Sequence, residues 1–274
     1  MERGERVKSE MTQIQRLDYL LEQFKIDSGR YRNLKVPDDP GEKRSLLRSL
    51  MNVRMPKDMP REVIEVQDAY LSERAEEKGI VRLSDIPVAK GRLSIWQGDI
   101  TRLAVDAIVN AANPQMLGCF VPMHNCIDNC IHTFAGVQLR AECGRIMDEL
   151  RKSHGMDYER PVAEPLLTGA YNLPARMVLH VVGPVVEGRL TPENESDLAL
   201  CYERCLDMCL ENGIRSVAFC CISTGVFGFP NRRASEIAVE TVSSWLSGRG
   251  DVVERVVFNV FKDEDRMLYE ALLI

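Results

Sequence analysis

The chain has 274 residues, 45% of them hydrophobic, which is enough for one large domain with a substantial appendage. Its net charge of −6 at pH 7 argues against nucleic-acid binding, and the lack of an apolar run of about 20 residues argues against a membrane span. Nine cysteines without a secretory signal indicate a reducing compartment, so we expect a soluble, cytoplasmic protein.

Residues 1–90 are predicted to form a helical N-terminal extension. Apolar side chains recur at helical spacing from Met11 to Phe24, and again from Leu46 to Met51. A third helix is predicted over about residues 60–78, with Gly79 closing it. No ligand cluster or glycine-rich loop occurs in this segment. We interpret it as an extension packed on the main domain, with a docking surface for a macromolecular substrate as the alternative.

Residues 91–274 alternate between strand and helix patterns. Strands are predicted near residues 93–97, 105–109, 166–171, 177–182, 217–222 and 252–261. Helices are predicted at about residues 126–151, 198–212, 234–246 and 263–273. This alternation predicts an α/β domain whose sheet is covered by helices on both faces. Ligands bind such sheets at loops beyond the carboxyl ends of the strands.

Two motifs follow the first two predicted strands of this domain. Asp99, in Gly98-Asp99-Ile100, comes directly after a strand and is able to accept a hydrogen bond from an exocyclic amine. A cap for the following turn is an equal alternative. Asn113 ends the run Asn110-Ala111-Ala112-Asn113, whose small residues would let a sugar approach the backbone.

The loop from Asn110 to Gly136 is unusually rich in cysteine and histidine. Cys119, His124 and Cys126 lie close together in it. Two thiolates and an imidazole suit a single zinc ion, and a fourth coordination position would remain for water or substrate. Cys130 is a rival ligand, one turn inside the next predicted helix.

A second loop, Ser223 to Pro230, also comes directly after a predicted strand. Its two glycines permit close approach of the backbone to a ligand, and its successive N–H groups suit a diphosphate. Phe227 and Phe229 are candidates for stacking on a ligand or covering it. A tight strand-to-helix connection with core aromatic residues is the alternative.

In combination, GDIT, AIVNAAN, HTFAG and STGVFGFP resemble the macrodomain family over about residues 91–274. The resemblance implies a three-layer α/β/α sandwich with a mixed sheet, preceded here by the helical extension, and it implies ADP-ribose binding. Asp99 would bond the adenine amine beside Ile100, and Asn113 would contact the distal ribose. The diphosphate and distal ribose would be bound by Ser223, Thr224, Gly225, Val226 and Phe227, with Phe229 nearby.

The Cys- and His-bearing loop replaces the glycine run of many hydrolytic macrodomains, and it resembles the zinc-dependent microbial branch. That resemblance assigns the metal ligands to Cys119, His124 and Cys126. Asp128 occupies the position of an acidic residue near the distal ribose, where it would orient or deprotonate a water. We therefore name Asp128 and Asn113 as the candidate catalytic residues.

The function expected from this resemblance is a zinc-dependent, glycosidase-type hydrolase that removes mono-ADP-ribose from modified protein side chains. An ester to an acidic side chain is the easiest target chemically. The resemblance also implies a lipoyl-carrier-like protein and a sirtuin-type ADP-ribosyltransferase as partners. Two alternatives are an ADP-ribose reader without catalysis and a deacetylase of O-acetyl-ADP-ribose.

Overall fold

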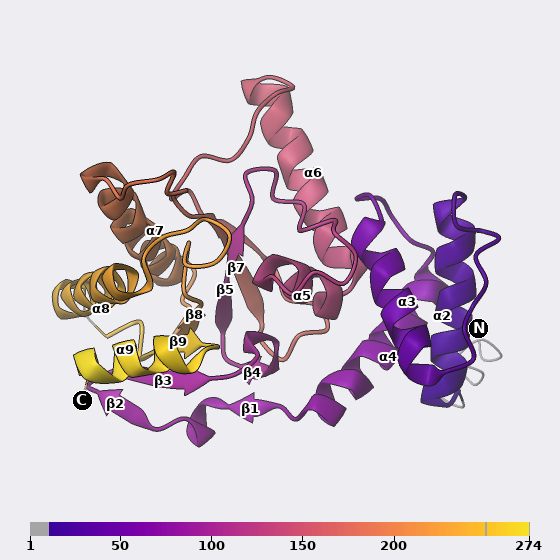
Figure 1. The fold of residues 1–274 in the computed structure, drawn as a ribbon, viewed down its shortest axis with the longest axis horizontal. Coiled ribbons are helices and arrows are strands. Elements are labelled where there is room, and N and C mark those ends of the chain that lie inside the picture. Colours follow the sequence, from indigo (N-terminus) through magenta and orange to yellow (C-terminus); the bar gives the residue numbers. More distant parts are fainter. Residues whose placement is uncertain (1–10, 250, 274) are drawn as a thin grey trace. The chain divides into compact units, whose positions relative to one another are not determined.

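The computed structural model describes residues 11–249 and 251–273, and Figure 1 labels its elements. The chain divides into two units of dense internal contact. The first comprises the chain through Gly79 with residues 117–146 and 171–173, and the second comprises residues 80–116, 147–170 and 174 onward. This division follows contacts in space. The predicted boundary between residues 90 and 91 was drawn along the sequence, and it stays a prediction.

Three helices form the N-terminal part of the first unit. They are α2 (Gln13–Ser28), α3 (Pro40–Val53) and α4 (Arg61–Lys78). A capping box at Thr12 begins α2, and Asp39 followed by Pro40 begins α3. The inward faces form a core with Val137, made of Leu17, Leu20, Leu21, Phe24, Leu47, Leu50, Met51, Val63, Val66, Tyr70 and Leu71. The three predicted helices are therefore confirmed.

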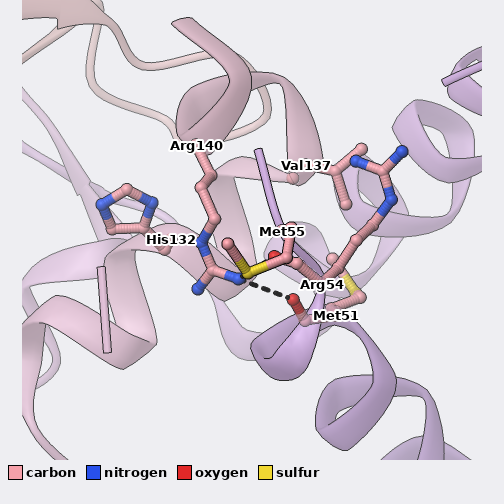
Figure 2. Close-up of a pocket in the computed structure, with 7 residues that line it drawn as sticks. Met51, Arg54, Met55, His132, Val137 and Arg140 are labelled. Carbon is pink, nitrogen blue, oxygen red and sulfur yellow. Dashed lines mark hydrogen bonds between the residues drawn. The ribbon is translucent and has the colours of Figure 1, made fainter. Parts of the chain in front are cut away.

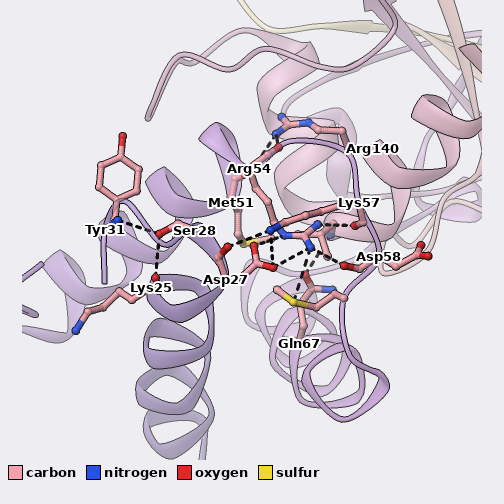
Figure 3. A network of polar contacts seen from close by, with 12 residues as sticks. Lys25, Asp27, Ser28, Tyr31, Met51, Arg54, Lys57, Asp58, Gln67 and Arg140 are labelled. Carbon is pink, nitrogen blue, oxygen red and sulfur yellow. Dashed lines mark hydrogen bonds and ion pairs between the residues drawn. The ribbon is translucent and has the colours of Figure 1, made fainter. Parts of the chain in front are cut away.

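An ion-pair network centred on the buried Arg54 joins the end of α2 to the turn after α3 (Figure 3). The Arg54 guanidinium donates to the Asp27 carboxylate at 2.9 Å and to the carbonyl of Lys57 at 2.8 Å. The Lys57 ammonium lies 3.0 Å from the same carboxylate. Burial alone would raise the pKa of Asp27, but the hydrogen bonds from Arg54 and Lys57 outweigh it and lower that pKa. The network therefore fixes the turn after α3 to the end of α2.

The helix predicted at about residues 126–151 is two helices. They are α5 (Ile127–Ala135) and α6 (Val137–His154), whose residues up to Ile146 belong to the first unit. Gly136 separates them with φ of +96°, a conformation that only glycine adopts readily. A Cβ at Gly136 would also lie 2.6 Å from the Gln67 side-chain amide. The single predicted helix was wrong because its apolar periodicity continues across this break.

The second unit contains a seven-stranded mixed sheet, ordered β2-β3-β9-β8-β5-β7-β6. Its strands are β2 (Val88–Lys90), β3 (Leu93–Gln97), β5 (Ala107–Ala112), β6 (Leu166–Gly169), β7 (Met177–Val182), β8 (Ser216–Phe219) and β9 (Arg255–Val260). The five central strands are parallel, and the edge strands β2 and β6 are antiparallel to their neighbours. The predicted α/β class with a mixed sheet is confirmed.

The remaining elements complete this unit. A parallel pair is formed by β1 (Val81–Arg82) and β4 (Leu103–Ala104). The helices are α7 (Pro192–Glu211), α8 (Asn231–Gly248) and α9 (Asp263–Leu273). In this unit α8 packs between α7 and α9, and α9 packs against β3 and β9. Strand structure begins at Val81, twelve residues before the first predicted strand near residues 93–97, because β1 and β2 are too short to show a clear period of two.

None of the nine cysteines, all within the described residues, forms a disulfide. Over the same part of the chain, we find no helix with the length and apolar character that crossing a membrane requires.

Candidate functional site

The parallel strands of the second unit bring the predicted ligand-binding residues to one edge of the sheet. Because β3, β9, β8 and β5 are parallel neighbours, their carboxyl ends meet at that edge. The residues that follow these strands are, in the same order, Asp99, Phe261, the loop 220–229 and Asn113. The strands that end before Asp99 and Asn113 are three strand spacings apart, which is about 14 Å. The edge therefore suits an elongated ligand that lies across the strand ends.

Asp99 lies at the first strand end and caps a short 3-10 helix. Its carboxylate accepts from the Thr101 amide at 3.0 Å and from the Thr101 hydroxyl at 2.7 Å. The cap interpretation is therefore confirmed. It does not exclude a bond to an adenine amine, because a carboxylate has two oxygens with several acceptor sites. Ile100 is buried beside it. The Asn259 side chain, from β9, donates to the Gly98 carbonyl at 3.0 Å and ties this turn to the sheet.

Asn113 begins a turn directly after β5. Its side-chain oxygen accepts from the Gln115 amide at 3.0 Å, and its carbonyl accepts from the Met116 amide at 2.9 Å. The amide oxygen therefore shapes the loop, while the residue is half-buried at the strand end. A contact with a ribose hydroxyl stays a prediction.

The loop after β8 has the backbone expected of a ligand-binding turn. Ser223 has φ of +64°, which is unusual for a residue other than glycine, and such strain concentrates at binding sites. Its buried hydroxyl has no hydrogen-bond partner among the described residues. An unpaired buried hydroxyl is costly, so an oxygen-rich ligand would satisfy it. The Val186 amide donates to the Phe227 carbonyl at 2.9 Å and holds the loop against the chain beyond β7.

The remaining loop residues divide by exposure. Val226 is 84% exposed, Gly225 is exposed, and Thr224 and Phe227 are half-buried, so all four can be reached by a ligand. Phe229 is only 1% exposed and therefore packs in the core. It anchors the end of the loop. This agrees with the alternative prediction that the loop contains a core aromatic residue.

Phe261 is a candidate residue that the sequence reasoning missed. It directly follows β9 and is 75% exposed, between the strand ends that carry Asp99 and Ser223. An exposed aromatic ring at this position has no core role and is available for stacking on a base. The feature that could have identified Phe261 is its position immediately after the last parallel strand along the chain.

Cys119, His124 and Cys126 converge in the first unit, on a segment that we term the metal loop (residues 117–126). Their ligand atoms all lie within 4.8 Å of one another. The Cys119 Sγ lies 3.5 Å from the His124 Nδ1. Tetrahedral zinc with ordinary bond lengths separates its sulfur and nitrogen ligands by about 3.5–3.8 Å. The three residues therefore fit zinc, with little rearrangement needed.

Cys126 has a second role, because it is the N-cap of α5. Its Sγ accepts from the Asn129 amide at 3.4 Å. Burial, opposed by this hydrogen bond, raises the pKa of the Cys126 thiol to about 12. The rival ligand Cys130 is not part of the cluster. Its sulfur lies 3.6 Å from the Arg48 guanidinium instead.

Side chains of α3 and α5 hold the metal loop in place. The Arg48 guanidinium donates to the His124 carbonyl at 2.7 Å and to the Asn129 side-chain oxygen at 2.9 Å. Asn129 in turn donates to the carbonyls of Cys119 and Val121 at 3.2 and 3.0 Å. Asn52 accepts from the Met123 amide at 3.0 Å. Helices α3 and α5 therefore support the loop that carries the three proposed metal ligands.

Arg140 connects the same elements from α6. Its buried guanidinium donates to the carbonyls of Met51, Asn52 and Arg54 at 3.1, 2.7 and 2.6 Å, at the C-terminal end of α3. Figure 2 shows Arg140 beside Met51 and Arg54. Burial lowers the pKa of Arg140 to about 10, and the nearby Asp128 opposes the decrease, so the group stays charged at pH 7. The adjoining cavity measures about 10 Å³, which is room for about one water.

Asp128 lies in the first turn of α5, two residues after Cys126. It is only 5% exposed, and its Oδ1 lies 3.6 Å from the His132 Nε2. The positive end of the helix dipole favours a carboxylate at this position. Gly118, with φ of +77°, lets the start of the metal loop approach the His132 ring, since a Cβ there would lie 2.7 Å from that ring. Asp128, His132 and the metal loop thus form one packed group.

Comparison with known proteins identifies the class to which these features belong. Residues 109–238 match the family model "Macro domain". The protein-ADP-ribose hydrolase of Treponema medium is 47% identical over 267 residues, covering 96% of this chain and 100% of that protein. The protein of the same name from Staphylococcus aureus strain Mu50 is 42% identical, covering 94% and 95%.

Solved structures agree. The Trypanosoma brucei macrodomain in complex with ADP-ribose is 28% identical with a TM-score of 0.62, and the match covers 87% of this chain and 97% of that one. The chain therefore belongs to the macrodomain family, and its α/β architecture is the macrodomain fold.

Proposed function

We propose that this protein is a zinc-dependent hydrolase that removes mono-ADP-ribose from modified protein side chains. One observation carries the proposal: the three zinc-type ligands converge within 4.8 Å of one another in a macrodomain chain. The names of the relatives from Treponema medium and Staphylococcus aureus support the reaction class. The nine cysteines, none in a disulfide, support action in a reducing compartment.

The order of the strand ends supports an orientation for ADP-ribose. Adenine would bind at Asp99 and Phe261, and the diphosphate would follow along Ser223 to Phe227. The buried Ser223 hydroxyl would donate to a phosphate oxygen and so gain the partner that it lacks among the described residues. The distal ribose would then lie toward Asn113. Only six positions along the chain separate Asn113 from Cys119, the first proposed metal ligand.

Cys119, His124 and Cys126 would hold one zinc ion, with the histidine bound through Nδ1. When bound there, zinc would supply a Lewis acid with one coordination position left for an oxygen ligand. Arg48, Asn52 and Asn129 would keep the loop carbonyls, and with them the three ligand side chains, in a fixed geometry. Such fixed support is what metal ligands require from the residues around them.

Asp128 would position the attacking water and accept its proton. The carboxylate is buried, is stabilised as an anion by the N-terminus of α5, and has His132 beside it. Water attack would break the bond between the distal ribose unit and the modified side chain, and ADP-ribose would leave with a hydroxyl group. We propose an ester to an acidic side chain as the bond that is cleaved, because a carboxylate is a good leaving group.

A release assay tests the reaction. Full-length, zinc-containing protein is incubated with a purified protein that carries mono-ADP-ribose, and free ADP-ribose and the loss of mass from the carrier are followed by mass spectrometry. Carriers in which ADP-ribose is attached to a carboxylate, a guanidino group or a hydroxyl group are compared. We expect release from the ester-linked carrier. Tight binding of ADP-ribose without release from any carrier would contradict the hydrolase and favour a reader.

Phe261 gives a separate prediction about binding. If its exposed ring stacks on adenine, Phe261→Ala should raise the Kd for ADP-ribose about tenfold, as expected for one base–aromatic contact. Isothermal titration calorimetry measures this without requiring catalysis. Met156→Ala is the control, because Met156 is also a highly exposed apolar side chain of the second unit. Equal Kd values for the two variants would exclude Phe261 from the adenine site.

The expected partners, a lipoyl-carrier-like protein and a sirtuin-type ADP-ribosyltransferase, stay a proposal that rests on the family resemblance.

A further inference from the structure

A cavity of about 210 Å³ lies in the first unit, beside the metal loop. Residues of α3 and α4 form most of it, and Met123 of the metal loop with Thr133 and Phe134 of α5 complete it. None of the three proposed zinc ligands lines it. The cavity is therefore separate from the metal cluster but shares the loop and the helix that carry the cluster and Asp128.

The charge of this cavity is opposite to that of the protein as a whole. Four of its lining side chains are cationic: Arg44, Arg48, Arg74 and Lys78. Within the described residues, no aspartate or glutamate lines it, although Arg74 forms an ion pair with Glu77. The chain carries a net charge of −6, so this local excess of positive charge would select and steer an anionic partner.

Apolar surface accompanies the charges. Leu47, Met51 and Leu71 line the cavity from the helix core, and the Lys78 ammonium lies 3.1 Å from the centre of the Phe134 ring. Small-molecule sites usually exceed roughly 300 Å³, so this volume suits one large side chain better than a cofactor. The combination fits a peptide segment that inserts an apolar side chain and places carboxylates on the rim.

We infer that this cavity docks an acidic segment of the ADP-ribosylated protein. The inference rests on the proposed function, because it assumes a protein substrate. Arg48 links the two sites: it lines the cavity and also donates to the His124 carbonyl at 2.7 Å. A carboxylate that binds at the rim would therefore lie next to the residue that supports the metal loop. Docking would place the modified side chain of the same protein near the catalytic residues.

Arg44→Glu tests the docking site, because Arg44 is exposed and contacts none of the metal ligands. The matched control is Arg61→Glu, which makes the same change of charge on α4, at a side chain that is 91% exposed and outside the cavity. The probe is a fluorescein-labelled synthetic peptide in which leucine is flanked by glutamates, with a glutamine version for comparison. Anisotropy gives the Kd, and the release assay gives KM and kcat for an acidic carrier.

We expect Arg44→Glu to raise both the peptide Kd and the KM roughly five- to tenfold, as charge reversal at a partly exposed ion pair does, while Arg61→Glu changes neither. Any of three results would overturn the inference. The two substitutions could have equal effects, the glutamine peptide could bind as tightly as the glutamate peptide, or the wild-type protein could fail to bind the glutamate peptide. Displacement of the peptide by inorganic phosphate at a similar concentration would also overturn it, since the site would then take small anions. Peptide binding needs no catalysis. Failure of release with binding intact would therefore overturn only the proposed function.

Discussion

The variant Cys126→Ala is expected to lose bound zinc and to lower kcat/KM for ADP-ribose release about a thousandfold. Removal of one thiolate leaves two protein ligands, which bind zinc too weakly to keep it at ordinary concentrations. A thousandfold loss corresponds to about 4 kcal/mol of transition-state stabilisation, a magnitude typical of a catalytic metal. Metal analysis by inductively coupled plasma mass spectrometry and the release assay measure the two effects on the same sample.

Two further variants separate the roles of Cys126. Cys126→Ser keeps a good N-cap for α5 but not the soft ligand, so it should restore the melting temperature without restoring zinc or activity. Cys130→Ala is the matched control, since Cys130 lies four residues later and outside the cluster, and it should retain both zinc and activity. If loss of zinc in Cys126→Ser instead lowered the melting temperature sharply, the metal would be structural.

Asp128→Ala, and the more conservative Asp128→Asn, should slow release at least a hundredfold while zinc stays bound. General base catalysis by one residue contributes about that much, and neither substitution removes a proposed metal ligand. Both substitutions should also lower stability, because they remove a charge at a helix N-terminus, worth about 1 kcal/mol, and the negative charge near the buried Arg140. Asp148→Asn, at an exposed position on α6, is the control for loss of a negative charge and should behave as the wild type.

The result that would contradict this role is a normal kcat in Asp128→Asn with full zinc content. A raised KM with an unchanged kcat would instead show that Asp128 only helps to hold the distal ribose.

Local patterns predicted most of the fold. Most of the predicted apolar stripes from Met11 to Phe24 and from Leu46 to Met51 is buried, because helical periodicity reports which face is covered; Ile14, at 57% exposure, is the exception. The break at Gly136 was missed because the apolar residues on its two sides follow the same helical periodicity. The two short strands β1 and β2 were missed because two or three residues carry no measurable alternation.

The candidate site was predictable where function depends on residue type and neighbours in the chain. Cys119, His124 and Cys126 lie in one loop, and the family resemblance, rather than their spacing alone, pointed to these three residues. The support from Asn52 was not predictable, since its bond to Met123 joins residues 71 positions apart. Phe261 was missed because the case for it as a ligand-binding residue depends on the order of the strands in the sheet. The burial of Phe229 was not predictable, since exposure depends on packing that no local pattern records, and its place near the ligand stays a prediction.

The most direct test of the account is the dependence of activity on bound zinc. Full-length protein is stripped with a chelator, zinc is restored in measured amounts, and release of ADP-ribose from an ester-linked carrier is followed at each step. Binding of ADP-ribose is measured in parallel as a control for the fold. The account predicts that release is lost with the metal, returns in proportion to zinc, and saturates at one ion per chain. Full activity in stripped protein that contains less than a few per cent of one zinc equivalent would contradict it.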